Sequence, residues 1–571
     1  MLLTNLDLLA TAPGGAARLR ELILTLAVQG KLVPQDPADK PARVLLQTIR
    51  AEKDRLIAEG QIKRDKPLAE IAEEETPFEL PQGWRWARLG DLCSYIQRGK
   101  GPVYADHSPH RVVSQKCVRW HGLDLAPARF VTTESLSKYE PIRLLRAGDL
   151  LWNSTGTGTI GRACLVPLAN DKDGLVADSH VTVVRPMHID SRFLWRWIQS
   201  PYVQDEIEGS ASGTTNQIEL NTATVVNHLF PLPPLGEQSR IVTRVDELMR
   251  LCDALEVKGQ LETTQHAQLV STLLSTLTGS TTPEELANHW QRVAQHLDLL
   301  LDRPEAIDAL EQTLLQLAVR GLLVPQDPAE EPANTQLARI RTRKDRLIAE
   351  GKIKRDKPLP PIPDEERPFE LPMGWEWVRV NDVVETLNGY AFKSEWFKQT
   401  GVRLLRNLNV GHGRVDWSQS AMLDPVSAKD YEPFALRKGD IVLSLDRPII
   451  STGLKYALIR ASDLPCLLLQ RVARLAPWLD AVSPEFLVLW LQSDLFVSTI
   501  DPGRSNGVPH ISTKQVGGLA LALPPLAEQS RIVTRVTALR GLCADLRQRL
   551  KASQVTQSHL AQALVESSNV L

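Results

Sequence analysis

Apolar residues recur at helical spacing along two long stretches of the chain, each of which begins just after a Leu-Pro-Pro-Leu run. In the first stretch the spacing alternates between four and three residues, at Ile241, Val245, Leu248, Cys252 and Leu255. The second stretch, 291 residues further along, repeats this spacing at Ile532, Val536, Leu539 and Cys543. The pattern predicts two amphipathic helices of about 40 residues, each about 60 Å long. One small domain cannot bury a helix of that length, so we expect the two helices to lie antiparallel against each other.

The same shift of 291 residues relates most of the chain to itself. KDRLIAEG, which begins at Lys53, returns at Lys344. Residues 1–280 therefore map onto residues 292–571 as a tandem duplication. Stacked repeat proteins have periods of about 20 to 50 residues, so a period this long corresponds to one whole domain with its connectors, copied once.

Two shorter helices are predicted within each matched block. Leu19, Leu22 and Leu26 have roughly helical spacing, and Gly30 is a good helix terminator. The VPQDP run that follows contains an Asp-Pro step, which ends a helix and turns the chain. A second helix through VLLQTIRAEKDRLIAEG then stops at Gly60. The second copy repeats both helices with their glycines.

Between the matched blocks the two copies differ, over residues 88–230 and 379–522. Short β-like runs such as HRVVSQKCV, RLLRAGDLLW and HVTVVRP alternate with turns, while FLWRWIQSPYVQDEIEG predicts a helix. The second copy keeps this outline, because LRKGDIVLSLD answers LRAGDLLWNST. Each stretch has the size of one globular domain. The pattern indicates one scaffold that presents two different surfaces.

The composition narrows the class of protein. With 571 residues, 43% of them apolar and 23% charged, the chain has enough material for about three or four folded domains. No uncharged apolar run approaches the roughly 20 residues that span a bilayer, and the N-terminal residues lack the basic start of a secretory signal. We therefore expect a cytoplasmic protein with no membrane partner. A formal charge of −2 argues against indiscriminate coating of nucleic acid, but it leaves room for a local basic cleft.

One glycine motif is similar to a cofactor-binding fingerprint. Gly156, Gly158 and Gly161 form a GxGxxG after a strand-like run. A fingerprint should open a helix, but Pro167 and turn formers follow, and the second copy has DRPIIS in its place. We interpret the motif as a tight loop that lets the backbone approach DNA or another strand. The six cysteines contain no CxxC pair, and no metal-spaced His cluster is present, so no catalytic or metal site is predicted.

Four pairs of repeated motifs cover essentially the whole chain in order. They are LAVQGKLVPQDP with LAVRGLLVPQDP, ELPQGWRWARLGDL with ELPMGWEWVRVNDV, LRAGDLLWNSTGTGTIG with LRKGDIVLSLD, and LPPLGEQSRIV with LPPLAEQSRIV. In these motifs the chain resembles the specificity subunit (HsdS) of type I restriction-modification systems. The resemblance implies a non-catalytic subunit with two target-recognition domains, each reading one half of a bipartite site in double-stranded DNA. It also implies that two modification (methyltransferase) subunits and two restriction (translocase and nuclease) subunits assemble on the chain. S-adenosylmethionine, ATP and Mg would then bind to those partners, and this chain would hold no cofactor.

The predicted fold class is α+β, with two mixed α/β target-recognition domains separated by long antiparallel coiled-coil helices and a pseudo-two-fold internal repeat. The predicted regions are an N-terminal helical repeat region (1–83), a first target-recognition domain (84–232), a central helical spacer region (233–374), a second target-recognition domain (375–523) and a C-terminal spacer helix (524–571).

The duplication suggests how these parts divide the work. Matched segments are expected to face a partner that is present in two identical copies, and unmatched surfaces two unlike DNA half-sites, because different base edges require different donors and acceptors. If the helices relate the domains by an approximate two-fold axis, the half-site centres lie about one DNA turn apart, roughly 34 Å. The helices would then set the length of the spacer between the half-sites.

Candidate base-reading residues are polar, lie in predicted turns and differ between the copies. Arg suits guanine, and Asn or Gln suits adenine, because each pairing is bidentate. The candidates are Thr155, Thr157, Arg162, Thr214, Thr215, Asn216 and Gln217 in the first copy, and Arg447, Arg504, Ser505, Asn506 and His510 in the second. Candidate phosphate contacts, which position the protein without specifying sequence, are Lys100, Lys116, Arg119, Lys393 and Arg406. For each of these residues the alternative interpretation is an ordinary solvated surface position.

Two other functions are weighed beside DNA recognition. A DNA-modifying enzyme with its own cofactor site is suggested only by the glycine motif. A helical scaffold that joins protein partners without DNA is suggested by the near-neutral charge and the long helices.

Overall fold

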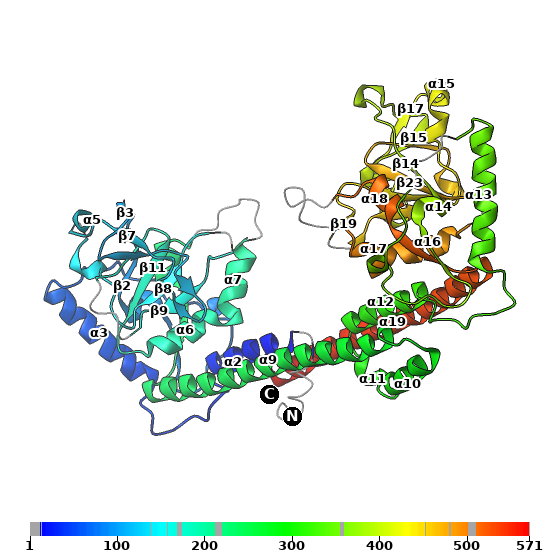
Figure 1. The fold of residues 1–571 in the computed structure, drawn as a ribbon. Helices are drawn as coiled ribbons and strands as arrows, with labels where there is room; N and C mark the ends of the chain where they lie inside the picture. The colour runs from blue at the N-terminus through cyan, green and yellow to red at the C-terminus, as the bar shows by residue number, and fades with distance from the viewer. Residues whose placement is uncertain are drawn as a thin grey trace. The chain divides into compact units, whose positions relative to one another are not determined.

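The fold is taken from a computed structural model, which describes residues 12, 14–137, 139–156, 158–167, 174–211, 220–353, 359–450, 453–478, 481–500 and 510–569. The chain divides into two compact units. Unit 1 comprises residues 1–262 with 554–571, and unit 2 comprises residues 263–553. Figure 1 labels many of their helices and strands.

Unit 1 contains, in chain order, α2 (Gly15–Val28), α3 (Ala42–Ala58), η1 (Glu73–Glu75), β1 (Arg85–Arg88), α4 (Leu89–Leu92), β2 (Cys93–Arg98), β3 (Tyr104–Ala105), β4 (Arg111–Val113), β5 (Val118–Arg119), β6 (Gly122–Leu123), β7 (Arg129–Val131), α5 (Thr133–Ser137), η2 (Pro141–Arg143), β8 (Leu150–Asn153), β9 (Ala163–Leu165), β10 (Val176–Ala177), β11 (Val181–Pro186), α6 (Ser191–Gln199), α7 (Pro201–Ala211), α8 (Thr222–Asn227), β12 (Leu229–Leu232) and most of α9 (Leu235–Thr278).

Unit 2 continues with the end of α9 and then α10 (Pro283–Ala294), α11 (Leu297–Leu300), α12 (Pro304–Val319), α13 (Ala333–Ala349), η3 (Asp364–Glu366), β13 (Glu376–Arg379), α14 (Val380–Val383), β14 (Val384–Asn388), η4 (Ser394–Trp396), β15 (Val402–Leu405), η5 (Asn407–Asn409), β16 (His412–Gly413), β17 (Ala421–Leu423), α15 (Pro425–Ala428), η6 (Lys429–Phe434), β18 (Ile441–Ser444), β19 (Ile449–Ile450), β20 (Gly453–Leu454), β21 (Tyr456–Leu458), η7 (Ala461–Asp463), β22 (Cys466–Leu468), β23 (Val472–Pro477), α16 (Pro484–Gln492), α17 (Asp494–Val497), α18 (Thr513–Gly518), β24 (Ala520–Leu523) and the first part of α19 (Leu526–Asn569). The rest of α19, from residue 554, belongs to unit 1.

A short antiparallel strand pair closes one globular part of each unit. We call these parts domain 1 (from β1 to β12) and domain 2 (from β13 to β24). Domain 1 contains the sheets β2-β11-β8-β9 and β10-β4-β7-β3, and domain 2 contains β14-β23-β18-β21-β16 and β17-β15-β22. The central register repeats, because Val181 lies opposite Asn153 and Val472 lies opposite Ser444. The α+β class is confirmed, whereas the division into five sequence regions stays a prediction.

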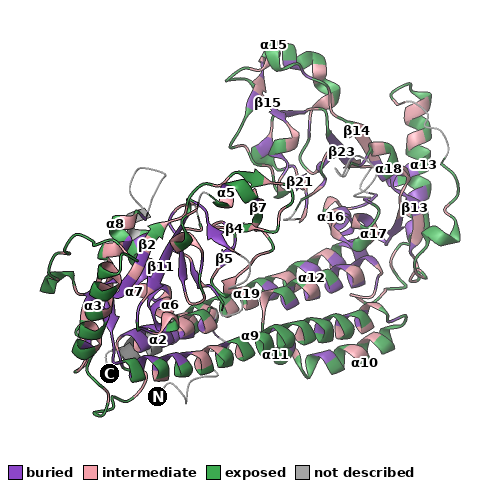
Figure 2. Ribbon diagram, turned by 90° about the vertical axis from the view of Figure 1, so that its left-hand side faces the viewer, coloured by how far each residue is buried: buried purple, intermediate pink, exposed green. Residues whose placement is uncertain are grey.

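The two long helices are present and keep the shift of 291 residues at both ends. Each spans 44 residues. In unit 1 Ala561 of α19 shares a core with Ile241 of α9, and in unit 2 Cys543 of α19 shares a core with Val270 and Leu274 of α9. The start of each helix therefore packs in the unit that holds the end of the other, so the helices run antiparallel. Figure 2 shows that much of the surface of α9 stays exposed.

The helix predicted over FLWRWIQSPYVQDEIEG is wrong in one respect, because the chain forms two helices there. Ser200 is extended between α6 and α7 (φ −68°, ψ 153°), and the proline that follows disfavours a helical conformation at this residue. The second copy breaks at Ser493 without a proline. In both copies the serine hydroxyl donates to a tryptophan carbonyl three residues back, at 2.7 and 2.6 Å. This local bond competes with continuation of the helix.

A buried carboxylate joins domain 1 to its long helix. Glu237, in the first turn of α9, is 1% exposed. It accepts hydrogen bonds from the indole Nε1 of Trp84 at 2.9 Å and from Nε2 of Gln35 at 2.6 Å. Burial raises the pKa of Glu237, while the two donors oppose that rise. Gly30 approaches the same indole so closely that a Cβ there would lie 2.9 Å from a ring carbon.

Domain 2 repeats this junction atom for atom. Glu528 of α19 accepts from Trp375 at 3.0 Å and from Gln326 at 3.1 Å, and a Cβ on Gly321 would lie 2.8 Å from the indole. The repeated VPQDP, GW and EQSRIV motifs supply these residues. Much of the identity between the copies is therefore accounted for by internal packing, where the sequence suggested only an external partner.

Replacing Trp84 by Phe should loosen unit 1 alone. The change removes the indole donor and leaves one buried carboxylate oxygen of Glu237 without it, a cost of about 1–3 kcal/mol. We expect faster amide hydrogen exchange around the start of α9, with protection in unit 2 unchanged. Trp375→Phe is the matched control and should give the reverse pattern. Equal loss of protection in both units would contradict the local role of this contact.

Acid should weaken domain 1 through His228. This side chain packs against Trp152 at 5.4 Å between ring centroids and accepts from Nε1 of Trp197 at 3.2 Å. Burial lowers its pKa from 6.5 to about 4, so the unfolded chain binds the proton more readily. The stability from neutral His228 is complete above pH 6.5 and is lost as the pH falls towards 4, by about 2 kcal/mol at pH 5.

The residue of the second copy that corresponds to His228 is Leu519, so leucine is the natural replacement with which to test the role of His228. His228→Leu should flatten the loss of hydrogen-exchange protection in domain 1 between pH 7 and pH 5. If the variant remains as acid-sensitive as the parent, another group controls the response.

Candidate nucleic-acid interface

Three loops meet at a surface cavity of about 540 Å³ in domain 2. They follow β15, follow β18 and precede β23. The polar and charged residues that line the cavity are Arg406, Asn407, Asp446, Arg447, Lys455, Gln470 and Arg471. Four of these carry positive charge and one carries negative charge, so the cavity is a local basic site in a chain whose formal charge is −2.

Two arginines of this cavity have left-handed backbone conformations. Arg447 has φ 50° and Arg471 has φ 69°. Among the described residues, His188 is the one further non-glycine residue with positive φ. Such conformations cost about 1–3 kcal/mol and concentrate at functional sites. The loops therefore hold both arginines at the cavity against the backbone's own preference.

A network of polar contacts lies at the cavity. Asp446 forms an ion pair with Nε of Arg471 at 3.2 Å, and its other carboxylate oxygen lies 2.9 Å from Nδ1 of His510. Lys455 donates to the carbonyl of Asn407 at 2.9 Å, and burial lowers the pKa of its ammonium group. These contacts orient charged groups before any ligand binds.

Domain 1 builds the same loops with different side chains. Thr155 Oγ1 lies 2.7 Å from Nδ1 of His180, at the place where domain 2 has Asp446 and Arg471. Nδ2 of Asn153 donates to the carbonyl of Gln115 at 3.1 Å. Domain 1 therefore presents a hydroxyl and an imidazole where domain 2 presents a carboxylate and a guanidinium.

The glycine motif belongs to this loop. Gly156 has φ 105°, and a Cβ there would lie 2.5 Å from the side-chain oxygen of Gln115. The loop leads from β8 into β9, so it joins two strands and does not open a helix. Close approach and backbone conformation account for the glycine without a nucleotide.

The structure brings several of the sequence candidates together. Arg406 and Arg447 line the cavity of domain 2, and His510 contacts Asp446 of that cavity. Thr155 lies at the equivalent place in domain 1. The carbonyl of Arg162 accepts from Asn153 at 2.8 Å at the far end of the same loop. The contacts of these residues with bases or phosphates stay predictions.

Other candidates lie apart or outside the described residues. Lys393 precedes η4 with its ammonium 5.8 Å from the ring centroid of Trp396, and Arg119 lies 4.0 Å from Asp124. Lys100 and Lys116 are exposed. The candidates outside the described residues are Thr157, Thr214, Thr215, Asn216, Gln217, Arg504, Ser505 and Asn506.

Sequence reasoning missed several residues of this site. They are His180 in domain 1 and Asn407, Asp446, Lys455, Gln470 and Arg471 in domain 2. A signal for one pair was present, because the shift of 291 residues places His180 beside Arg471 at the start of equivalent strands. Where two equivalent strands have similar sequences but the residues just before them differ, those residues are candidates for the variable edge of a shared fold.

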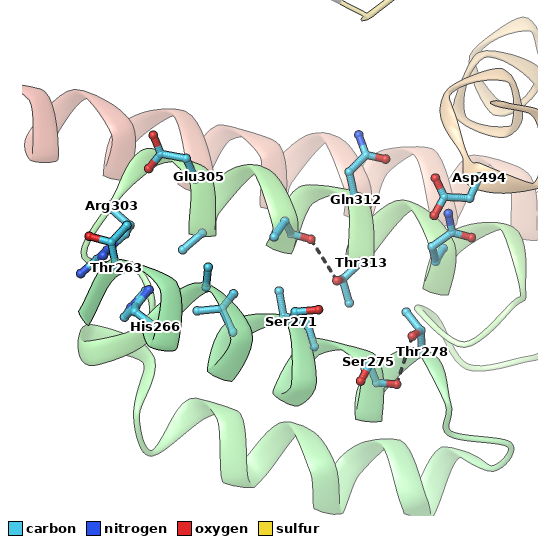
Figure 3. A pocket seen from close by; sticks show the side chains of 16 residues that line it. Thr263, His266, Ser271, Ser275, Thr278, Arg303, Glu305, Gln312, Thr313 and Asp494 are labelled. Atoms are coloured by element: carbon cyan, nitrogen blue, oxygen red, sulfur yellow. Dashed lines mark hydrogen bonds between the residues drawn. The ribbon is translucent and has the colours of Figure 1, made fainter. Parts of the chain in front are cut away.

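A second cavity, of about 450 Å³, follows the helices of unit 2 (Figure 3). Its lining includes Val270 and Leu274 of α9 and Ala306 of α12. At one end Nε2 of His266 lies 3.0 Å from the carbonyl of Leu299. The lining offers no paired acid and base, so we attribute this cavity to the packing of the helix bundle.

The comparisons with known proteins agree with the geometry. The family model described as "Type I restriction modification DNA specificity domain" matches residues 81–263 and again residues 372–555. The specificity subunit of the type I restriction enzyme EcoAI from Escherichia coli is 45% identical over 97% of this chain and 94% of its own length. The EcoEI specificity subunit from the same organism is 33% identical over 97% and 94%. The chain belongs to this family of type I specificity subunits.

Solved structures give weaker matches. A chain from a structure of a type I restriction-modification system has a TM-score of 0.48 and 20% identity, over 86% of this chain and 99% of its own. HsdS from Thermoanaerobacter tengcongensis has a TM-score of 0.39 and 20% identity, over 86% and 98%.

Membership of this family favours a recognition role over the enzyme and scaffold alternatives. In the part of the chain that the structure describes, no group of three or more His, Cys, Asp or Glu side chains could hold a metal ion. Within those same residues, no helix combines the length and the apolar character needed to cross a membrane.

Proposed function

We propose that this chain is the DNA-reading subunit of a cytoplasmic type I restriction-modification complex, with domain 1 reading one half of a bipartite site and domain 2 the other. The observation that carries this proposal is the pair of equivalent loop sites, which share a backbone plan and differ in side-chain chemistry. Two unlike half-sites require such a difference, because each base pair presents its own donors and acceptors in the major groove. The long helices α9 and α19 would set the spacer between the half-sites.

The catalytic work would lie with the partners. Two modification subunits and two restriction subunits would assemble on the chain, and they would bind S-adenosylmethionine, ATP and Mg. This chain would contribute sequence recognition and assembly, with no cofactor of its own.

A row of exposed residues on α9 supports the docking of a partner helix. Leu235, Ser239, Thr243, Glu247 and Leu251 follow one another every fourth residue, and all five are exposed. Residues at this spacing form the ridge that packs into the groove of a neighbouring helix. We call this row the docking ridge. Its final leucine is 60% exposed, so the part of the chain that the structure describes does not cover this apolar side chain.

The docking ridge returns on α19 with one change. Its members there are Leu526, Ser530, Thr534, Ala538 and Leu542, again all exposed. Leu542 is also 60% exposed. Arg244 and Arg535, both exposed, lie one residue beyond the threonines. Identical exposed residues in both copies support a partner present twice, with an apolar helix face and a carboxylate for the arginine.

Exchange of residues 84–232 for the corresponding segment of a related specificity subunit should change one half of the recognised site. The other half should remain, because domain 2 keeps its own loops. Sequencing of methylated bases in cells that express the chimera with its partners gives both halves at once. Changes in both halves would sink the modular proposal, and sequence-independent binding by the unaltered complex in a gel shift would favour the scaffold alternative.

Leu251→Lys should remove one modification subunit from the complex, and the double variant with Leu542→Lys should remove both, because each lysine places a charge in one apolar contact. Native mass spectrometry of the purified assemblies measures this stoichiometry directly. Val257→Lys is the control, because Val257 is 65% exposed on the same helix but lies off the ridge, where the second copy has Gln548. If the double variant still binds two modification subunits, the docking ridge is not the surface that binds them.

A further inference from the structure

Two pairs of side chains occupy equivalent places in the two domains and differ in chemistry. Thr155 contacts His180 in domain 1, and Asp446 contacts Arg471 in domain 2, with a shift of 291 residues for both members. The same backbone hydrogen bond frames both pairs. In each domain the amide before the first member donates to the carbonyl of the second at 2.9 Å. The pairs differ in their side chains, and Arg471 also has a positive φ whereas His180 does not.

Arg471 has the geometry of a base reader. Its side chain is 68% exposed at the rim of the cavity, and its Nε is held by Asp446 at 3.2 Å. The other carboxylate oxygen of Asp446 lies 2.9 Å from Nδ1 of His510, so contacts on two sides fix the carboxylate. Contacts among the described residues leave the two terminal guanidinium nitrogens of Arg471 available. Those nitrogens form a planar fork of parallel donors.

The backbone of this loop is strained in the same place. Arg471 has φ 69° and its neighbour across the cavity, Arg447, has φ 50°. A strained conformation persists only where the surrounding structure determines it, and here the contact with Asp446 and the strand register of β23 do so. The fork is thus positioned before DNA arrives, which limits the conformational entropy lost on binding.

His180, the residue of domain 1 that corresponds to Arg471, can make fewer hydrogen bonds to a base. Its Nδ1 lies 2.7 Å from Thr155, so one ring nitrogen, Nε2, is left for a ligand. A single nitrogen makes one hydrogen bond, whereas the arginine fork makes two. Gly156 also stands where domain 2 has Arg447, so no second cation supports it.

We propose that these pairs are the base-reading pairs of the two domains. Arg471, oriented by Asp446, reads guanine through the two acceptors O6 and N7, which match the guanidinium fork. His180, oriented by Thr155, contacts one atom of a base edge and selects less strictly. This inference rests on the proposed function of the chain and names the residues that carry out the recognition.

The test transplants one pair into the other domain. Asp446→Thr with Arg471→His gives domain 2 the pair of domain 1, and Thr155→Asp with His180→Arg does the reverse. Each double variant is expressed with its native partner subunits, and methylated sites are mapped across the genome. In the first variant we expect one guanine position in the half-site of domain 2 to become degenerate, with a loss of preference of about tenfold or more. All other positions should be unchanged. The reverse variant should gain guanine preference at one position in the other half-site.

Binding of the purified complex to duplexes that differ at single base pairs gives the same readout if methylation becomes too weak to map. Uniformly weaker binding to every duplex would overturn the inference, because it is the behaviour of a phosphate contact. An unchanged motif with normal methylation would overturn it as well. In both cases sequence-specific binding by the unaltered complex would leave the proposed function standing, whereas its absence would refute that function.

Arg437→Ala supplies the matched control. Arg437 lies in domain 2 outside the cavity, with a side chain that is 77% exposed. Its loss removes one positive charge from the domain, as the replacement of Arg471 does, whereas the double variant also removes the negative charge of Asp446. The recognised motif should therefore be unchanged in this variant.

Discussion

Each unit depends on one buried carboxylate, Glu237 in unit 1 and Glu528 in unit 2. A carboxylate that loses its water must gain hydrogen bonds, and here a tryptophan indole and a glutamine amide supply them. The three groups come from a helix-terminating loop, the residue just before the first strand of the domain and the start of the long helix. A different register would leave the carboxylate or a donor unsatisfied, so the contact specifies how each domain meets its helix.

This contact separates two reasons for sequence identity between the copies. Residues such as Trp84 and Trp375 are identical because they pack inside equivalent junctions. Internal packing does not explain the identical residues of the docking ridge, because they are exposed in the part of the chain that the structure describes. Their identity therefore favours an external partner. Burial is what distinguishes the two cases, and the sequence carries no direct record of it. An internal repeat is therefore evidence for a partner only at positions where the fold leaves the side chain exposed.

The elements that the sequence predicted well are those with long, regular patterns. The alternation of four and three residues from Ile241 and the proline pair before it are local properties, and they were sufficient to predict α9 and α19. The break at Ser200 was missed although the proline after it disfavours a helix there, and the equivalent break at Ser493 has no proline and depends on a side-chain bond that competes with the helix. The loops at the cavity were found only in part. Thr155 and Arg447 were recognised as unlike turn residues, but Asp446 and Arg471 are 25 residues apart, and their ion pair forms only when β18 and β23 lie side by side.

Unit 1 contains both the first and the last residues of the chain, which affects how it folds during synthesis on the ribosome. Its core includes Ala561, and Arg18 donates to the carbonyl of Ser558 at 2.7 Å across 540 residues of sequence. A ribosome makes these two partners far apart in time, at about 5–20 residues per second. Domain 1 can fold early, but the bundle beneath it must wait with apolar surface of α2 and α9 uncovered until the second half of α19 has emerged. The newly made chain therefore passes through a long interval in which its first unit lacks one helix, and that interval is when a chaperone or an early-binding subunit would protect it most.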